Sequence, residues 1–301
     1  MSETLQQVFR SSARDEQDQP WFFDVLPCRP QPYPDECLSG YLLRLAHTNG
    51  YLNFWDMVKG CFPVFRRPVR MSILRWEYPM DDWGCLPQRT QLPHLALERL
   101  TVLPWITKFC TPPVVTLPST SGPGRFLQGV VNPHLQVCSH CLQEQPYLRL
   151  RWRLAPVHVC VHHGCHLQTQ CYDCGTPLTV LGPTHRHLHC ATCGTDLRTL
   201  PVVAAPADIL EGQQRRQAEL QFLLDPEVTL VKDSTCDPRQ AVGLKFRYLR
   251  LQAGHSVVAM ARQVGTTFAR AIPNLELGQK WISLPLYLAY LEALSWSWSD
   301  F

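Results

Sequence analysis

Four cysteines between residues 171 and 194 have the spacing of metal ligands. The stretch CYDCGTPLTVLGPTHRHLHCATCG contains two CxxC pairs, Cys171 with Cys174 and Cys190 with Cys193, and 15 residues separate the pairs. This spacing is typical of a four-thiolate zinc ribbon, in which each pair supplies two ligands to one ion. A glycine follows each pair, and glycine allows the left-handed backbone that a knuckle under a metal needs. We therefore predict a structural zinc ion here.

Another set of ligands lies just upstream. By position in the chain we call it the first cluster, and the set between residues 171 and 193 the second cluster. Cys138 and Cys141 form a CxxC pair, and 18 residues later Cys160 and His163 repeat the same spacing. His162 is the adjacent alternative to His163. Three thiolates and one imidazole satisfy tetrahedral zinc as well as four thiolates do. The sequence thus predicts two structural Zn²⁺ ions as cofactors.

The remaining cysteines are scattered, and we expect them to be buried apolar thiols: Cys28, Cys37, Cys61, Cys85, Cys110, Cys165 and Cys236. Residues 1–20 lack the apolar core of a signal peptide, and no apolar run approaches the roughly 18 residues of a membrane span. We expect a cytoplasmic protein, in which reducing conditions disfavour disulfides and favour metal binding by paired cysteines.

Neither ligand set has the features of a catalytic metal site. A catalytic zinc keeps one position open for water, whereas each set here supplies four protein ligands. Zinc deaminases also place a proton-transferring Glu in an upstream HxE motif, but this chain has His134-Leu-Gln136 at too short a spacing. The Pro/Gly/Ser-rich stretch 116–129 contains no GK[ST] of a phosphate-binding loop. We predict that the chain is not an enzyme.

The N-terminal part is patterned as two short helices. Apolar residues recur at helical spacing on one face: Leu38, Tyr41, Leu42, Leu45 and Ala46. Asn49-Gly50 is expected to end this helix, and Asn53 to cap the next one. Two short helices joined by a tight turn predict a helix-turn-helix element.

Several basic features could contact nucleic acid, which the formal net charge of +3 permits without requiring it. Arg44 and His47 are expected to be exposed on the outer face of the first helix. Segment 59–75 contains five basic residues and no acid, including Arg66, Arg67 and Arg70. It could be a phosphate-contacting loop or, equally well, a solvated basic loop.

Another basic feature is LRLRWRL, residues 148–154. Alternation predicts a strand with Arg149, Arg151 and Arg153 on one exposed face and the apolar residues on the other. That face could contact phosphates or simply be solvated.

The last sixty residues are patterned as successive helices. Ser256 can cap one helix, Gly265 can make the following turn, and Thr266-Thr267 can begin the next helix, which is the order of a helix-turn-helix. These helices are a further basic feature, and Arg270 on the second of them is a candidate contact to nucleic acid or a partner. Pro273 would interrupt that helix, since proline removes a backbone donor.

We therefore expect a mainly α fold with small zinc-ribbon β elements. The predicted parts are a polar N-terminal tail (1–20), a helix-turn-helix domain (21–115), a linker (116–134), a tandem zinc-ribbon domain (135–200) and a helical, helix-turn-helix-like C-terminal domain (201–301).

Several of these motifs together resemble the TniQ/TnsD family of transposition target selectors. The resemblance covers roughly residues 25–200, through PYPDECLSGYLLRLAHTNG, CSHCLQEQPYLRLRWRL, VCVHHGCHL and the two later CxxCG knuckles. The C-terminal part separately resembles a Cro/repressor-type helix-turn-helix through Arg250, Ala261, Gly265, Glu276 and Gly278, and departs from it at Pro273. The resemblance assigns the same eight cysteine and histidine ligands to two zinc ions.

The resemblance implies a bacterial adaptor that is not itself a transposase or an ATPase. One surface would engage a target-bound CRISPR effector complex with its guide RNA or target DNA, and another an AAA+ ATPase regulator. It also suggests a homodimer. We favour this version because 301 residues is short for a TnsD protein that reads a long attachment site. Alternatives are a direct sequence-specific DNA binder of the TnsD type and a zinc-stabilised transcription repressor.

Overall fold

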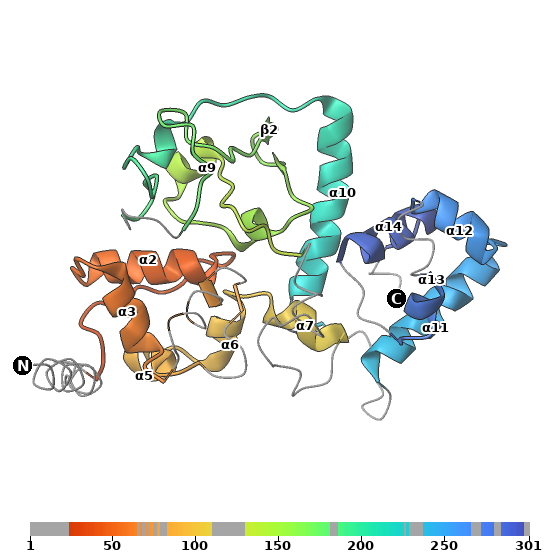
Figure 1. Cartoon of the computed structure of the whole chain (residues 1–301), viewed down its shortest axis with the longest axis horizontal. Helices are drawn as coiled ribbons and strands as arrows, with labels where there is room; N and C mark the ends of the chain where they lie inside the picture. The colour runs from red at the N-terminus through yellow and green to blue at the C-terminus, as the bar shows by residue number, and fades with distance from the viewer. Residues whose placement is uncertain are drawn as a thin grey trace, which may run out of the picture.

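The computed structural model describes residues 24–64, 67, 70, 73–74, 77–78, 83–109, 130–180, 186–225, 227–228, 237–265, 272–279 and 284–297. The fold is mainly helical, as predicted, and the described residues form one two-stranded sheet (Figure 1). The N-terminal helices are α2 (Leu38–Thr48), α3 (Phe54–Cys61), α5 (Leu86–Thr90), α6 (His94–Glu98) and α7 (Leu103–Phe109). None of the described helices is long and apolar enough to cross a membrane.

Helix α2 forms where the sequence predicts it, because its apolar face is buried. The five residues predicted for that face are all at most 4% exposed: Leu38, Tyr41, Leu42, Leu45 and Ala46. The helix ends at Thr48, and Gly50 follows with a φ of 71°. Asn53 caps α3 by accepting a hydrogen bond from the Trp55 amide at 3.0 Å, which confirms the predicted cap.

The N-terminal helices share a core with the segment that carries the first metal ligands. The Cys37 amide donates to the Leu148 carbonyl at 2.9 Å, and the Leu150 amide donates to the Asp35 carbonyl at 2.6 Å. Gly40 is packed so closely that an added Cβ would lie 2.8 Å from the Leu148 Cβ. Helix α2 is thus fixed directly against residues 148–150.

The cysteine-rich region contains little regular structure. It consists of α9 (Ser139–Glu144), the 3₁₀ helices η1 (Leu150–Arg153) and η2 (Leu197–Thr199), and the antiparallel strands β1 (Val159–Cys160) and β2 (Cys165–His166). In the β1–β2 pair Val159 faces His166 and Cys160 faces Cys165. The predicted strand over 148–154 is wrong, because η1 occupies most of it. A three-residue repeat replaces the two-residue repeat there, so the arginines do not share one solvent face.

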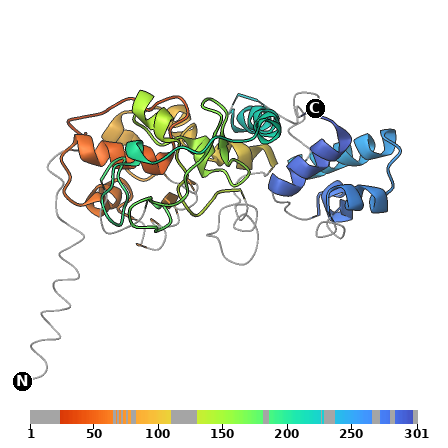
Figure 2. The same ribbon diagram turned by 90° about the horizontal axis from the view of Figure 1, so that it is seen from above.

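Helix α10 (Ala207–Leu224) lies between the cysteine-rich region and the C-terminal helices, as Figures 1 and 2 both show. It contacts β1 and α7. The Gln213 side chain accepts a hydrogen bond from the His158 amide at 3.2 Å, and its amide group donates to the Pro156 carbonyl at 3.4 Å. The domain boundary proposed at residue 201 stays a prediction.

The C-terminal helices are α11 (Pro238–Gln252), α12 (Val257–Gln263), α13 (Ile272–Glu276) and α14 (Leu284–Leu294). Ser256 caps α12 as predicted, by accepting from the Ala259 amide at 3.1 Å. A buried ion pair joins α11 to α13, since the Arg250 Nη2 donates to the Glu276 Oε2 at 2.8 Å. Tyr290 of α14 donates to the same carboxylate at 2.6 Å. Thr266, Thr267 and Arg270 lie outside the described residues.

Candidate metal centres and basic surfaces

The four cysteines of the second predicted set converge on one point. The Cys171 and Cys193 sulfurs are 3.6 Å apart, and the Cys174 and Cys190 sulfurs are 3.8 Å apart. Two thiolates at about 2.3 Å from a tetrahedral ion would be about 3.8 Å apart, so these distances fit a four-thiolate zinc site. They are far longer than the ~2.05 Å of a disulfide bond.

The two halves of this second cluster are built alike. The Cys171 amide donates to the Thr176 carbonyl and the Gly175 amide to the Cys171 carbonyl; Cys190 and Gly194 repeat both bonds. The glycines have φ values of 66° and 81°, which confirms the predicted left-handed turns. Burial favours the neutral Cys190 thiol, but backbone N–H groups of Cys193 and Thr192 outweigh burial and lower its pKa. Such groups favour the thiolate form that binds a metal.

The first set of ligands also converges, with His163 as predicted. Its Nδ1 lies 3.4 Å from the Cys138 sulfur, 3.2 Å from the Cys141 sulfur and 3.7 Å from the Cys160 sulfur. The ligand atoms of each set lie within 4.8 Å of one another. Both groups could therefore hold a metal ion, and the donors of the first are three sulfurs and one nitrogen.

Glu144 supports the first cluster, and the sequence analysis missed it. Its Oε1 is 2.9 Å from the His163 Nε2, the nitrogen that faces away from the sulfurs. A carboxylate in this position fixes the tautomer that leaves Nδ1 free to bind metal. The signal was present in the sequence, because Glu144 follows Cys141 by three residues on α9 and so shares its helix face.

Cys165 lies beside the first cluster without completing it. Its sulfur is 3.6 Å from the Cys138 sulfur, and the residue is buried. Of the other scattered cysteines, Cys37 and Cys61 are buried as expected, whereas Cys28 is exposed, so the expectation is wrong for Cys28. Cys110 and Cys236 lie outside the described residues.

The predicted solvent-facing arginine face over 149–153 is also wrong. Arg153 is 1% exposed, and its Nε donates to the buried Glu77 carboxylate at 2.9 Å. Arg149 is 4% exposed, and its guanidinium lies 4.4 Å from the Tyr147 ring centroid. Only Arg151 keeps substantial exposure, with its Nε 3.3 Å from an Asp35 oxygen. These arginines are chiefly parts of the core.

Arg44 is not freely exposed either, whereas His47 is exposed as predicted. The Arg44 side chain is 14% exposed, and two of its nitrogens donate to the Glu36 carboxylate at 2.8 and 2.6 Å. The sequence pattern placed Arg44 correctly opposite the apolar face, but it could not show that Glu36 and the Tyr33 ring cover it.

The basic segment 59–75 is described only in part, and Arg66 lies outside the described residues. Arg67 is exposed, with its guanidinium 5.4 Å from the centroid of the Trp55 ring. Arg70 is partly buried and donates to the Phe62 carbonyl at 3.1 Å, and burial lowers its pKa. Arg67 therefore remains available to a partner.

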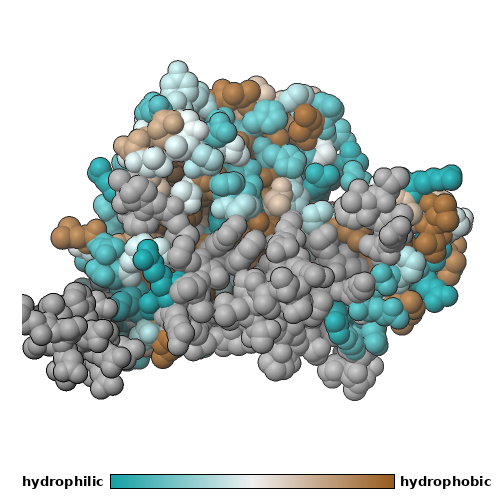
Figure 3. All heavy atoms as spheres, viewed as in Figure 1, coloured by the Kyte–Doolittle hydropathy of each residue, from teal (hydrophilic) through white to brown (hydrophobic). Residues whose placement is uncertain are grey.

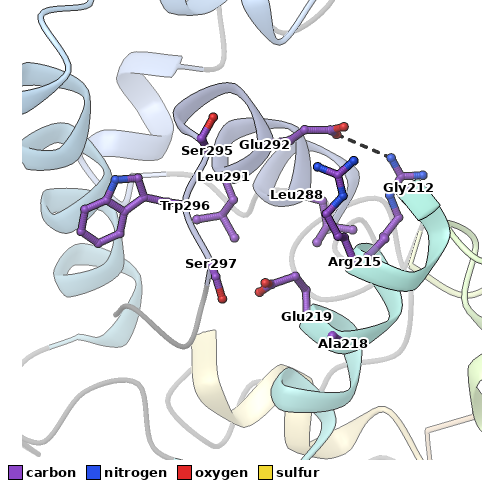
Figure 4. A pocket seen from close by; sticks show the side chains of 11 residues that line it. Gly212, Arg215, Ala218, Glu219, Leu288, Leu291, Glu292, Ser295, Trp296 and Ser297 are labelled. Carbon is purple, nitrogen blue, oxygen red and sulfur yellow. Dashed lines mark ion pairs between the residues drawn. The ribbon is translucent and has the colours of Figure 1, made fainter. Parts of the chain in front are cut away.

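A groove of about 430 Å³ lies between α10 and α14 (Figure 4). Leu288 and Leu291 contribute apolar surface to it, and an ion pair between Arg216 and Glu292 at 3.6 Å spans its rim. Trp296 lies at its edge and is 40% exposed. The groove offers apolar surface and charge rather than a set of groups positioned for proton transfer.

Apolar side chains are also exposed on the C-terminal helices. Leu244, Tyr248 and Leu251 are each more than half exposed and follow one face of α11 at helical spacing. Val258 of α12 is 61% exposed, and Figure 3 shows apolar atoms over this end of the molecule. Such surfaces are typical of protein contacts.

Comparison with known families decides the assignment. The sequence matches the TniQ family over residues 27–167, which include α2 and all four ligands of the first cluster. Residues 27–167 are thus similar to the TniQ family. No curated protein matches the chain. The matched region therefore contains the first candidate metal cluster, whereas the second cluster and the groove between α10 and α14 lie beyond it. The TniQ family implies a role in selecting the target of transposition.

Proposed function

We propose that the chain is a non-enzymatic transposition adaptor of the TniQ type. It links a target-bound CRISPR effector complex to an AAA+ ATPase regulator of transposition. The observation that carries the proposal is the TniQ match over residues 27–167, together with a metal cluster inside that match. The adaptor role is consistent with the sequence, in which we find no phosphate-binding loop.

In this proposal the two clusters hold structural Zn²⁺. Each supplies four protein ligands, which leaves no position for a reacting water. Zinc would tie together a region that has only four residues in strands among those described. Metal analysis of purified protein is expected to give two zinc ions per chain, and Cys174→Ser is expected to give one.

A second candidate is direct DNA recognition by the C-terminal helices, as in a TnsD protein or a repressor. The Ser256-capped helix α12 followed by Gly265 favours it, because this order matches a helix-turn-helix. Pro273 is the second residue of α13, in the first turn, where proline costs no intrahelical hydrogen bond, so the interruption predicted from the sequence does not weigh against this candidate. Exposed apolar residues on α11 suit a protein partner better than a phosphate backbone.

A pull-down separates the candidates. Tagged full-length chain is incubated with the AAA+ ATPase and the guide-RNA complex encoded beside it, and each is detected on its own. The adaptor role predicts that both are retained. Retention of neither, together with salt-dependent, sequence-specific binding to naked duplex, would replace the adaptor with the direct DNA binder. Size measurement of the purified chain tests the proposed homodimer.

A further inference from the structure

A basic pocket lies where α2 meets the residues that bracket the second cluster. Its volume is about 350 Å³, and no carboxylate is among its lining residues. Six of the lining side chains are arginine or histidine, and we define the basic pocket by them: Arg44, His47, Arg186, His187, His189 and Arg198. The pocket therefore concentrates N–H donors in a chain of only slight net charge.

Two of its guanidinium groups are held in place by carboxylates outside the pocket lining. Arg44 donates through Nε and Nη2 to Glu36, and Arg198 donates through the same two nitrogens to Asp196. Among the described contacts the Nη1 group of each arginine has no acceptor. Bidentate pairing of this kind fixes the plane of a guanidinium and leaves its Nη1 N–H groups able to bind a ligand.

Arg186 adds a charge that no acid neutralises within the described part of the chain. It is exposed at the pocket. The three arginines of the pocket carry three positive charges, and the paired carboxylates of Glu36 and Asp196 offset two of them. One net positive charge remains. A phosphodiester carries one negative charge and accepts hydrogen bonds at two free oxygens, so its charge and chemistry match those of the pocket.

His187 has a buried Nε2 with no hydrogen-bond partner among the described residues. Burial and the neighbouring charges of Arg44 and His47 lower its pKa to about 3, so the imidazole is neutral. Its ring stacks near that of His47, with centroids 6.3 Å apart. The positive surroundings that keep the His187 imidazole neutral would favour the binding of an anion.

We propose that the basic pocket binds a backbone phosphate of a nucleic acid. The phosphate chemistry stands on the pocket itself; the choice of nucleic acid rests on the proposed function, in which a guide RNA or target DNA is a partner. Arginines oriented by carboxylates suit a phosphate oxygen better than a solvated lysine would. A volume of about 350 Å³ admits a phosphate with its adjoining sugar.

The position of the pocket implies that the second cluster positions a binding site as well as stabilising the local fold. Residues 186–189 directly precede Cys190, and Arg198 follows Cys193 by five residues. Metal bound at the second cluster would therefore fix the half of the pocket that lies outside the region matched to the TniQ family. Helix α2 supplies the other half through Arg44 and His47.

Binding titrations with full-length protein test the inference. The probes are a fluorescein-labelled 20-base-pair duplex DNA and a 20-nucleotide single-stranded RNA, each titrated at several salt concentrations. The double variant Arg186→Gln/Arg198→Gln is expected to weaken binding of at least one probe about tenfold. It should also lower the slope of log affinity against log salt by about one to two, since each lost phosphate contact removes nearly one released counterion. The probe that loses affinity identifies the source of the phosphate.

The control is Arg215→Gln, which removes an exposed arginine of α10 outside the basic pocket and should leave both titrations unchanged. Should the double variant lose metal, His47→Asp tests the same point, because it places a carboxylate at the pocket from the exposed face of α2. Wild-type affinity and salt slope in the double variant or in metal-replete His47→Asp would overturn the inference.

The outcome is separable from that of the proposed function. Weakened probe binding in the pocket variants, combined with a wild-type chain that retains neither partner in the pull-down, would remove the adaptor role and keep the phosphate site. If instead the wild-type chain retains both partners and the pocket variants bind both probes normally, the adaptor role stands and the phosphate site is removed.

Discussion

At the residue scale, the first metal cluster depends on Glu144 as well as on its four ligands. The carboxylate is 2.9 Å from the His163 Nε2 and is about half exposed, so its removal leaves no buried gap. We expect Glu144→Ala to weaken metal binding at this cluster about 10- to 100-fold, the usual effect of losing a carboxylate behind a ligand histidine. Chelator competition on the purified protein measures it.

Glu211→Ala is the matched control, because it removes an exposed carboxylate from α10. Metal at the second cluster should resist the chelator equally in both variants and in the wild type. If in Glu144→Ala the metal of the first cluster resists the chelator as well as that of the second, His163 holds its position without the carboxylate.

Arg153 and Arg151 lie two residues apart, but their substitution by alanine should change the stability of the protein by very different amounts. Arg153→Ala would leave the fully buried Glu77 carboxylate without its cation, which costs about 3–5 kcal/mol for a broken buried pair. Arg151 is one-third exposed against Asp35, so Arg151→Ala should cost less than about 1 kcal/mol. Urea unfolding of both variants compares the two losses of stability. Similar midpoints would mean that both arginines are exposed to solvent, as the sequence suggested.

The sequence predicts which four side chains converge at each cluster because a knuckle is local. Two ligands three residues apart and a following glycine specify the turn without help from the rest of the chain. It fails for Arg153 because the partner of that residue, Glu77, is 76 positions away. Alternation alone cannot distinguish an arginine in water from one paired inside the core.

At the element scale, helix ends are predictable where a single side chain determines them. Asn53 and Ser256 accept the amide bonds expected of caps, and the apolar face of α2 is buried as its spacing requires. The segment 148–154 is different, because its backbone is fixed by Asp35 and Val131 from other parts of the chain. Tertiary contacts there override the alternating pattern.

Two glycines in helices provide a matched test of how closely elements pack. A Cβ added at Gly243 in α11 would lie 2.4 Å from the Leu275 carbonyl oxygen and 2.9 Å from that of Glu276. Gly243→Ala should therefore force α11 away from α13 and cost about 1–3 kcal/mol. Gly212 in α10 has nothing within 4 Å of its Cβ position, so Gly212→Ala should stabilise by up to about 1 kcal/mol.

Thermal unfolding distinguishes these variants by the sign of the shift. The midpoint should fall for Gly243→Ala and stay level or rise for Gly212→Ala. A fall of equal size in both would mean that helix geometry, rather than the close approach of α11 and α13, governs the result.

At the scale of the whole molecule, α7 is the element that joins the N-terminal and C-terminal parts. It contacts both α10 and α11, and Arg99 just before it pairs with Glu227 at 2.7 Å. These contacts join residues more than a hundred positions apart, so no local pattern in the sequence could have predicted them. Truncation near residue 205 would consequently uncover α7 as well as remove the C-terminal helices.

Lys108 of α7 makes this junction sensitive to pH. Its side chain is 7% exposed and donates to the Asp225 carbonyl beyond the end of α10, and burial lowers its pKa from 10.5 to about 8. Between these two values the unfolded chain binds a proton that the folded chain does not bind. Stability should therefore rise with pH from about 8 to about 10.5, by as much as about 3 kcal/mol.

Lys108→Met removes the titrating amine and should remove that rise, while Lys59→Met, which removes a charge from α3, should keep it. Urea unfolding of the three proteins at pH 7, 8, 9 and 10 gives the comparison, and differences between proteins cancel the groups that all three share. Parallel stability profiles for wild type and Lys108→Met would mean that the amine stays charged and solvated in the folded chain. In that case α7 would not be sealed against the end of α10, and the contact between the two parts of the molecule would be looser than the buried lysine indicates.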